Sequence, residues 1–290
     1  MIDRVPAANR IRLSDGATLH FIERGEGHPT ILLHGGMGDM QSWMPQLAAF
    51  SYRYRTISYS RRHSEPNENP FTVASDPAAA NANDLAELME ALDIDSAHLI
   101  GTSYGALIAL AFALRWPSRV TSLTLSEPPM HGWLEELPGG TVIHDRFMGE
   151  VWGRAAAEFR DGRSKQAMKI LGEAFGMRTE VFAHPANALS LRNARAMMSL
   201  ALSEQPFPRL DRTAVERLAT PTLILRGEAS DLIHTIGATE LARLLKRVWT
   251  AVIPDAGHRV PMENPEAFNR VVLRFLSIAC PGTDSAPPEA

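Results

Sequence analysis

The spacing of hydrophobic and polar positions changes several times along the chain and predicts a succession of strands. Residues 10–23 alternate apolar and polar positions around Asp15-Gly16, a pattern typical of a β-hairpin. Six later runs are short and rich in apolar residues, which suits strands covered on both faces of a parallel sheet. These runs occupy residues 30–33, 54–60, 97–100, 120–127, 221–227 and 248–258.

Segments with helical spacing lie between these runs. Residues 76–92 carry the clearest signals, with Asp76 as a cap and Pro77 in the first turn. Other expected helices cover residues 41–50, 106–116, 236–246 and 264–279. Because strands and helices alternate, the sequence predicts an α/β fold with a mostly parallel, doubly wound sheet and right-handed crossovers.

Residues 131–205 interrupt this alternation. They contain helical stretches at 146–159 and 164–175, and half of the twelve methionines lie in or next to them. One interpretation is a small helical core of its own. The other is a helical cap inserted before the last two strands, with an adaptable apolar underside above the carboxyl edge of the sheet.

The domain organisation follows from this interruption. We expect residues 1–130 and 206–280 to form one α/β core and residues 131–205 to form the cap. The final segment, 281–290, is small, polar and rich in proline, which predicts a disordered tail.

Composition narrows the range of functions. The chain has 290 residues, 45% of them hydrophobic, and a net charge of −4, so it lacks the excess of basic residues that nucleic-acid binding needs. A single cysteine, Cys280, excludes an internal disulfide. Residues 1–10 lack the apolar run of a signal peptide, and no stretch has about 18 consecutive apolar residues. We therefore expect a cytoplasmic protein that binds neither nucleic acid nor membrane.

The candidate chemistry begins at Gly101-Thr102-Ser103-Tyr104-Gly105. A G-x-S-x-G pattern is weak by itself, but here an expected strand precedes it and an expected helix follows at once. Glycines two residues on either side permit a turn so tight that the serine projects over the sheet edge. Glycine-rich turns also cradle phosphate, yet neither GK[ST] nor G-x-G-x-x-G occurs here. The pattern predicts Ser103 as a nucleophile.

A nucleophile of this kind needs hydrogen-bond donors for the oxyanion. The turn His34-Gly35-Gly36-Met37 ends an earlier strand, and the backbone N–H of Gly36 or Met37 is one expected donor. The backbone N–H of Tyr104 is the other. His34 lies inside this turn, where backbone shape matters most, so we interpret it as a structural histidine and not as a base.

The expected general base is His258. It follows the last strand in Pro254-Asp255-Ala256-Gly257-His258 and precedes a helix, a position that none of the other nine histidines shares.

With these residues in place, the sequence resembles the α/β-hydrolase superfamily over roughly residues 10–280. The matching motifs are HGG at 34–36, GTSYG at 101–105 and GH at 257–258. The resemblance implies a catalytic triad in the chain order serine, acid, histidine.

The acid has two candidates. Family members usually place it three residues after a glycine, but Ser230 is found three residues after Gly227 here, and Asp231 is one further. Certain lactonases and lipase-like members take the acid from the strand that follows the nucleophile helix, where this chain has Glu127. We prefer Glu127, because a carboxylate at the end of an apolar strand would otherwise be an unpaired charge, and Asp231 stays as the alternative.

A second departure from the family is the basic segment Arg61-Arg62-His63, where many members have a glycine-rich loop. One interpretation is a solvated basic turn. The other places Arg62 or His63 near the pocket mouth, where a positive charge would favour an acidic substrate.

The predicted activity is hydrolysis of a small carboxylic ester or lactone through an acyl-enzyme, with no metal and no organic cofactor. Hydrolysis of a C–C bond in a diketone is an alternative within the same fold. A non-hydrolytic ligand-binding protein is an alternative from another class. Sequence does not indicate the oligomeric state or the substrate.

Overall fold

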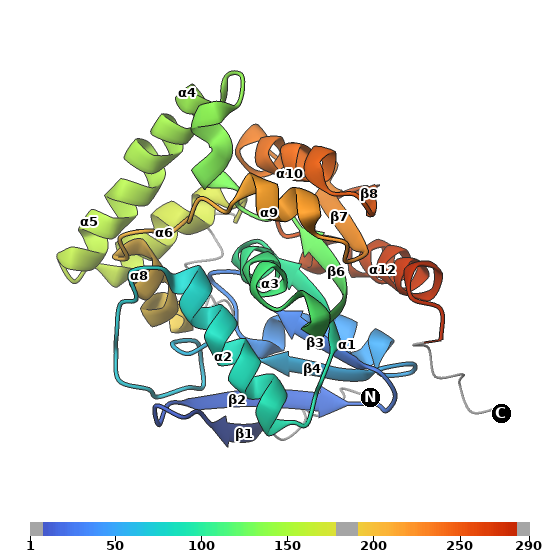
Figure 1. The fold of residues 1–290 in the computed structure, drawn as a ribbon. Helices are drawn as coiled ribbons and strands as arrows, with labels where there is room; N and C mark the ends of the chain where they lie inside the picture. The colour runs from blue at the N-terminus through green and yellow to red at the C-terminus, as the bar shows by residue number, and fades with distance from the viewer. Residues whose placement is uncertain (1–7, 178–190, 283–290) are drawn as a thin grey trace.

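A computed structural model describes residues 8–177 and 191–282 of the chain. Within these residues, eight strands form one sheet in the order β1-β2-β4-β3-β5-β6-β7-β8 (Figure 1). The strands are β1 (Asn9–Arg12), β2 (Thr18–Arg24), β3 (Pro29–Leu33), β4 (Arg55–Tyr59), β5 (Ala97–Thr102), β6 (Val120–Ser126), β7 (Thr222–Gly227) and β8 (Val248–Ile253).

The sheet is mostly parallel, as predicted. β1 and β2 form the expected hairpin, and β2 also pairs with β4 in antiparallel orientation. The remaining pairs, from β4 through to β8, are all parallel. The carboxyl ends of β3, β5, β6, β7 and β8 therefore meet at one edge of the sheet.

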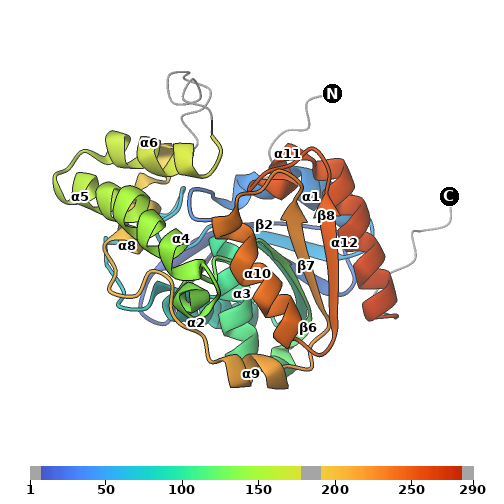
Figure 2. The ribbon, with the colours of Figure 1, turned by 90° about the horizontal axis from the view of Figure 1, so that it is seen from above.

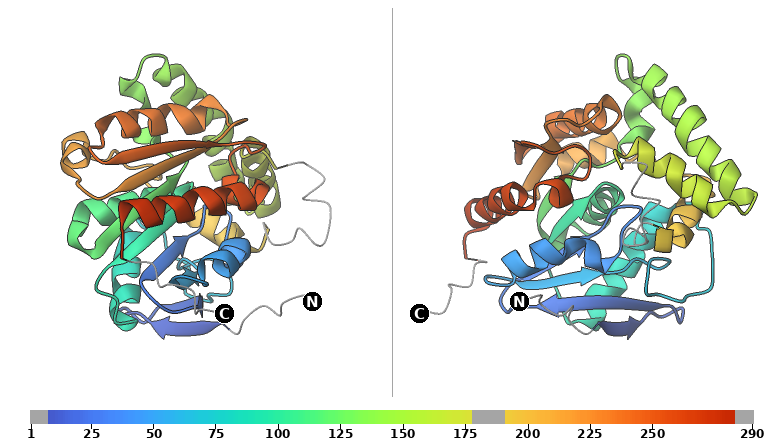
Figure 3. Two further views of the ribbon diagram at one scale, coloured as in Figure 1. Left: turned by 90° about the vertical axis from the view of Figure 1, so that its right-hand side faces the viewer. Right: turned by 180° about the vertical axis from the view of Figure 1, so that it is seen from behind.

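Helices cover both faces of the sheet, which confirms the doubly wound fold. The apolar sides of α2 (Pro77–Ala91), α3 (Tyr104–Arg115) and α10 (Leu232–Leu244) share one buried cluster. On the opposite face lie α1 (Met44–Phe50) and α12 (Pro265–Ala279) (Figure 3). Their apolar side chains contribute to a second buried cluster. Asp76 caps α2 by accepting a hydrogen bond from the backbone N–H of Ala79 at 3.0 Å, as its position in the sequence predicts.

The segment between β6 and β7 is helical, as expected for a cap inserted before the last two strands. In this segment, η3 (His131–Glu136) is followed by α4 (Gly140–Arg146), the π-helical η4 (Phe147–Gly153), α5 (Arg154–Arg160), α6 (Ser164–Ala174) and α8 (Ala194–Ala201). No strand occurs in 131–177 or 191–205. In Figure 2, α4, α5, α6 and α8 lie together to one side of the sheet.

Four shorter elements connect the rest: η1 (Met40–Trp43), η2 (Pro117–Arg119), α9 (Arg212–Arg217) and α11 (Val260–Glu263). Cap residues 178–190 and tail residues 283–290 lie outside the described part of the chain. Among the described helices, none combines the length and the apolar character needed to cross a bilayer.

Candidate active site

Ser103 lies at the sharp turn between β5 and α3, where its sequence motif predicts it. Its backbone has φ 50° and ψ −122°, a strained conformation for a residue with a side chain. A Cβ on Gly105 would lie 2.1 Å from the carbonyl oxygen of Leu33, and one on Gly101 would lie 2.5 Å from the backbone of Gly105. Only glycine fits at both places, so the two glycines permit the turn that leaves Ser103 partly exposed at the sheet edge.

Glu127 occupies the equivalent position on the neighbouring strand. It is the first residue after β6, it has φ 48°, and its side chain is fully buried. One carboxylate oxygen, Oε1, accepts a hydrogen bond from the backbone N–H of Gly227 at 2.8 Å and another from the hydroxyl of Ser230. The buried charge is thus held by donors from the β7 loop.

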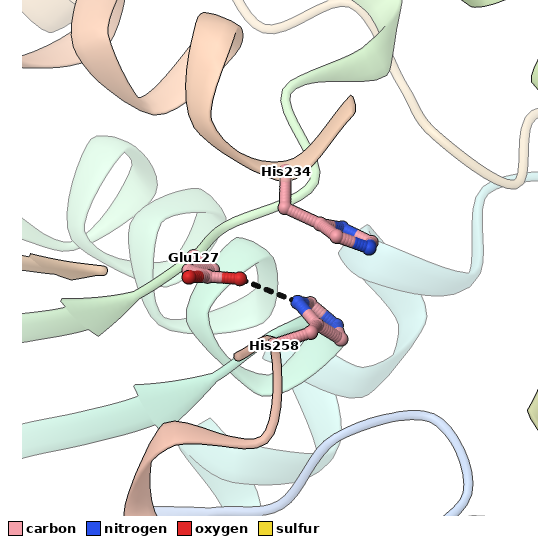
Figure 4. A group of neighbouring side chains, drawn as sticks. All are labelled: Glu127, His234 and His258. Carbon is pink, nitrogen blue, oxygen red and sulfur yellow. Dashed lines mark hydrogen bonds and ion pairs between the residues drawn. The ribbon is translucent and has the colours of Figure 1, made fainter. Parts of the chain in front are cut away.

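His258 completes a hydrogen-bonded chain with these two residues. Its Nδ1 lies 2.6 Å from Oε2 of Glu127 (Figure 4). Its Nε2 lies 3.0 Å from Oγ of Ser103. A carboxylate only accepts, so Nδ1 carries the proton and Nε2 is free to accept the serine proton. The geometry suits removal of a proton from Ser103.

The loop before His258 is held by the β7 loop. A Cβ on Gly227 would lie 2.3 Å from the carbonyl oxygens of Ala256 and Gly257, so glycine allows the two loops to touch. The backbone N–H of Ala229 donates to the carbonyl of Ala256 at 2.9 Å. These contacts fix the position from which the imidazole projects.

Asp231, the other candidate acid, is not brought to His258. It lies at the N-terminus of α10 and is exposed, and its carboxylate makes no hydrogen bond or ion pair to any described residue. Ser230, one position earlier, points its hydroxyl at Glu127 instead. The loop after β7 therefore supplies a hydrogen-bond donor, the hydroxyl of Ser230, to the buried carboxylate of Glu127. It does not supply a carboxylate to His258.

The three expected oxyanion donors belong to the elbow itself and to the turn that packs on it. Tyr104 is the first residue of α3, so its backbone N–H has no acceptor within the helix. Gly35 packs on the elbow, since a Cβ there would lie 3.5 Å from Cβ of Ser103. Gly36 and Met37 follow in this turn, and Sδ of Met197 from α8 packs on Gly36. The cap thus touches the turn directly.

His34 is fully buried beneath this turn, in agreement with a structural interpretation. Its Nδ1 lies 2.8 Å from the carbonyl oxygen of Gly35, and its Nε2 accepts from the backbone N–H of Arg61 at 3.0 Å. Burial, together with the charge of Arg61, holds the pKa of His34 well below its ordinary value. The ring is a neutral bridge between two loops.

The interpretation of Arg61-Arg62-His63 as a solvated turn is wrong, because the backbone after β4 turns inward. Arg61 and His63 are buried, and Arg62 is bound to Asp84 and Asp15, both at 2.6 Å. The three residues line a cavity of about 360 Å³ between α2 and α8 whose lining does not include Ser103, Glu127 or His258. The charge of Arg62 is neutralised, so it does not attract an acidic substrate to the serine.

Two further histidines lie near His258, and no sequence motif points to either of them. His234 of α10 stacks on the ring of His258, with ring centroids 3.6 Å apart and planes 18° apart, and both rings extend in the same direction (Figure 4). Burial lowers the pKa of His234 well below its ordinary value, and its electrostatic interactions with His258 and His131 act in the same direction. Within the described residues neither ring nitrogen of His234 has a hydrogen-bond partner.

His131 is the second of these residues and lies where the chain enters the cap. Burial lowers its pKa to about 3, although the nearby backbone of Ile233 acts weakly in the opposite direction. Its ring contacts the rings of Phe147 and Phe207, with centroids 4.7 and 4.4 Å away. Neither of its ring nitrogens makes a hydrogen bond to a described residue.

The spacing of Glu127, His234 and His258 would admit a cation, because their ligand atoms lie within 4.8 Å of one another. The orientation is unsuited to one. The lone pair of an imidazole nitrogen lies in the plane of the ring. Two stacked rings therefore point their lone pairs in parallel directions, and these do not converge on a single metal position. Nδ1 of His258 is also already bound to Glu127. The group is better arranged for proton transfer than for metal binding.

A strained serine at a strand-to-helix turn, a histidine after the last strand and a carboxylate between them in sequence together define a site of the α/β-hydrolase class. Residues 30–271 match the Alpha/beta hydrolase family, and the chain belongs to this family and is a hydrolase.

Known proteins agree with this assignment. The "Putative carbamate hydrolase RutD" of Caulobacter sp. (strain K31) is 27% identical to this chain over 265 residues, which cover 86% of this chain and 90% of that protein.

Two solved structures share the fold. A thermophilic esterase from Thermogutta terrifontis has a TM-score of 0.74 and 24% identity, covering 94% of this chain and 99% of that one. The enol-lactonase from Burkholderia xenovorans LB400 also has a TM-score of 0.74, with 20% identity, covering 93% of this chain and 100% of that one.

Proposed function

We propose that this protein is a serine hydrolase that cleaves a small carboxylic ester or lactone through an acyl-enzyme. The observation that carries the proposal is the continuous hydrogen-bonded chain from Oγ of Ser103 through His258 to Glu127, at 3.0 and 2.6 Å. The esterase and the enol-lactonase of the same fold support the substrate class.

In the first half of the reaction, Oγ of Ser103 bonds to the carbonyl carbon while Nε2 of His258 takes the serine proton. The carbonyl electron pair moves to oxygen, where the backbone N–H groups of Tyr104 and of Gly36 or Met37 stabilise it. The bond to the leaving oxygen then breaks, and that oxygen takes the proton from His258. Glu127 keeps the imidazole in the required tautomer and stabilises its charged form.

In the second half, water attacks the acyl carbon and gives its proton to His258, which returns it to Oγ of Ser103. The acid product leaves. With a lactone, the leaving alcohol stays attached to the acyl group, so the product is a hydroxy acid.

A second candidate substrate is a carbamate, which the printed name of the curated relative favours. A carbamoyl group would pass through the same steps. Phenyl acetate and phenyl carbamate differ only by CH₃ against NH₂ on the reacting carbonyl, so the pair separates the two candidates.

The test is covalent labelling with a fluorophosphonate, together with hydrolysis of phenyl acetate, phenyl carbamate and a panel of lactones. We expect one label per wild-type chain, none on Ser103→Ala, and turnover of at least one substrate that Ser103→Ala abolishes. Equal labelling of wild type and Ser103→Ala would overturn the proposal.

A further inference from the structure

Arg61 has an unusual environment for a charged side chain. Only 3% of the residue is exposed, and it forms no ion pair with any carboxylate in the described part of the chain. The guanidinium group instead lies over the ring of Tyr104, 5.5 Å from its centroid. A buried, unpaired charge is costly, so its other contacts are informative.

Those contacts are two consecutive peptide carbonyls of the turn below Ser103. Nη2 of Arg61 donates to the carbonyl oxygen of Gly35 at 3.1 Å and to that of Gly36 at 3.0 Å. The only cis peptide bond of the described residues is Glu65-Pro66, so the Gly35-Gly36 and Gly36-Met37 bonds are trans.

In a trans peptide the C=O and N–H bonds point in opposite directions. A carbonyl of Gly35 bound to Arg61 therefore turns the N–H of Gly36 away from the guanidinium group. The same holds for the carbonyl of Gly36 and the N–H of Met37. The two N–H groups whose orientation is fixed in this way are the two candidates for the oxyanion donor of this turn.

We propose that Arg61 is a positioning residue of the oxyanion hole, which orients and polarises the peptide groups that end in the N–H of Gly36 and the N–H of Met37. A cation at the carbonyl end of a peptide strengthens its N–H as a donor, and hydrogen bonds in such a chain reinforce one another. The stabilisation is greatest when negative charge develops in front of the N–H groups, which happens only in the transition state.

The same contact joins the two halves of the oxyanion hole. Tyr104 supplies the donor on the elbow side, and its ring packs on the guanidinium group that holds the other side. His34 adds a second link, because it accepts from the backbone N–H of Arg61 and contacts the carbonyl of Gly35. Arg61 thus sets the distance between donors that come from separate strands.

The experiment compares Arg61→Met with the matched control Arg62→Met. Both arginines line the same cavity, but Arg62 binds the carboxylates of Asp15 and Asp84 and makes no hydrogen bond to a peptide of the turn within the described residues. We expect Arg61→Met, corrected for active Ser103 by fluorophosphonate titration, to lose about 10- to 100-fold in kcat with KM changed less than about threefold, since losing one oxyanion donor outright costs about 100- to 1,000-fold. Arg62→Met should lose stability and keep kcat.

A second readout excludes a merely structural effect. Phenylboronic acid binds serine hydrolases by forming a negatively charged tetrahedral adduct with the serine, so it reports on the oxyanion hole. Across wild type, Arg61→Lys and Arg61→Met, the inhibition constant of phenylboronic acid should rise in parallel with the fall in kcat/KM. Arg61→Lys should be intermediate, because lysine keeps the positive charge but lacks the planar guanidinium group that donates several hydrogen bonds. Arg61→Lys also serves if Arg61→Met does not fold.

This inference rests on the proposed function, and the two fail differently. Absence of labelling on wild-type Ser103 would overturn the proposed function. Normal labelling, with kcat and boronate affinity of folded Arg61 variants within twofold of wild type, would overturn the role of Arg61 alone. A fall in kcat without a matching loss of boronate affinity would overturn it as well.

Discussion

The two walls of the site differ in how their polar groups are satisfied. The sheet wall consists of Ser103, Glu127 and His258 at the strand ends, where each carboxylate oxygen and each imidazole nitrogen has a partner. The other wall, which we call the cap wall because it lies on the cap side of His258, consists of His131, Phe147 and Phe175 of the cap together with Phe207 and His234 of the core. Its two imidazoles have no hydrogen bond within the described residues, and its other members are aromatic.

This difference suggests different functions for the two walls. A complete hydrogen-bond network on the sheet wall suits bond-breaking steps common to many substrates. Buried polar groups without partners cost about 1–3 kcal/mol each, and native proteins keep few of them. Because the four ring nitrogens of His131 and His234 are among them, we expect the cap wall to be the side that distinguishes individual substrates.

The largest expected effect is on the sheet wall and concerns its carboxylate. Glu127→Gln should lower kcat/KM by about 10³- to 10⁴-fold, because the neutral amide no longer stabilises the imidazolium form of His258. Asp231→Asn is the matched control and should stay within twofold of wild type. Steady-state kinetics on one ester decides the matter, and a reversed pair of results would make Asp231 the acid.

The second prediction addresses His131 on the cap wall through its pH dependence. Its pKa is about 3 when folded and near 6.5 when unfolded, so only the unfolded chain gains this proton between these values. Stability from this group is therefore present above pH 6.5 and is lost as pH falls toward 3. His131→Phe removes this loss of about 2 kcal/mol and also the cost of about 1 kcal/mol for the unpartnered nitrogens, so it should be more stable than wild type by about 3 kcal/mol at pH 5.

Urea unfolding at pH 7.5 and pH 5, followed by circular dichroism, measures this difference. At pH 7.5 the gain should shrink to about 1 kcal/mol, which is the cost of the unpartnered nitrogens alone. A stability difference that does not change with pH would show that His131 does not titrate as its burial requires.

A third, smaller effect should distinguish substrates. His234→Phe keeps a ring stacked on His258 but removes both nitrogens, so it leaves the general chemistry in place. If His234 contacts a polar acyl group, kcat/KM for phenyl carbamate should fall about tenfold while that for phenyl acetate stays within twofold, as expected for one lost hydrogen bond. Equal losses for both substrates would place His234 with the general machinery of the sheet wall.

The smallest expected effect concerns Ser230, which donates to Oε1 of Glu127. Ser230→Ala should lower kcat/KM about fivefold, because the N–H of Gly227 still holds the same oxygen and one hydrogen bond contributes about 1 kcal/mol. The kinetics of Ser230→Thr, which retains the hydroxyl, provide the comparison. A loss as large as that of Glu127→Gln would mean that the hydroxyl alone orients the carboxylate.

Much of the sheet wall could be predicted from sequence, because its signals are local. The elbow motif, the glycine turn at 34–36 and His258 each follow a recognisable strand, and parallel strands bring their ends together. The choice of acid was harder, since both Glu127 and Asp231 follow strands that end at this edge. It depends on the direction of one side chain, which spacing does not specify.

The cap wall could not be predicted in the same way. His131 and His234 reach His258 through a turn after β6 and a helix after β7, and no periodicity relates them. The burial of Arg61 could not be predicted from sequence for a related reason. Three consecutive basic residues suggest solvent, and only the tertiary structure shows that the first of them meets peptide carbonyls.

Glu127 at the end of β6 has a practical consequence for finding related sequences. A search pattern that demands an aspartate in the loop after β7 would accept this chain because of Asp231, which is exposed and remote from the histidine in its contacts. Such a pattern would assign the chain to the correct superfamily but would select Asp231 as the acid in place of Glu127. A pattern that pairs the elbow with a glutamate just after the next strand, and a small hydroxyl residue after β7, describes the contacts that are made.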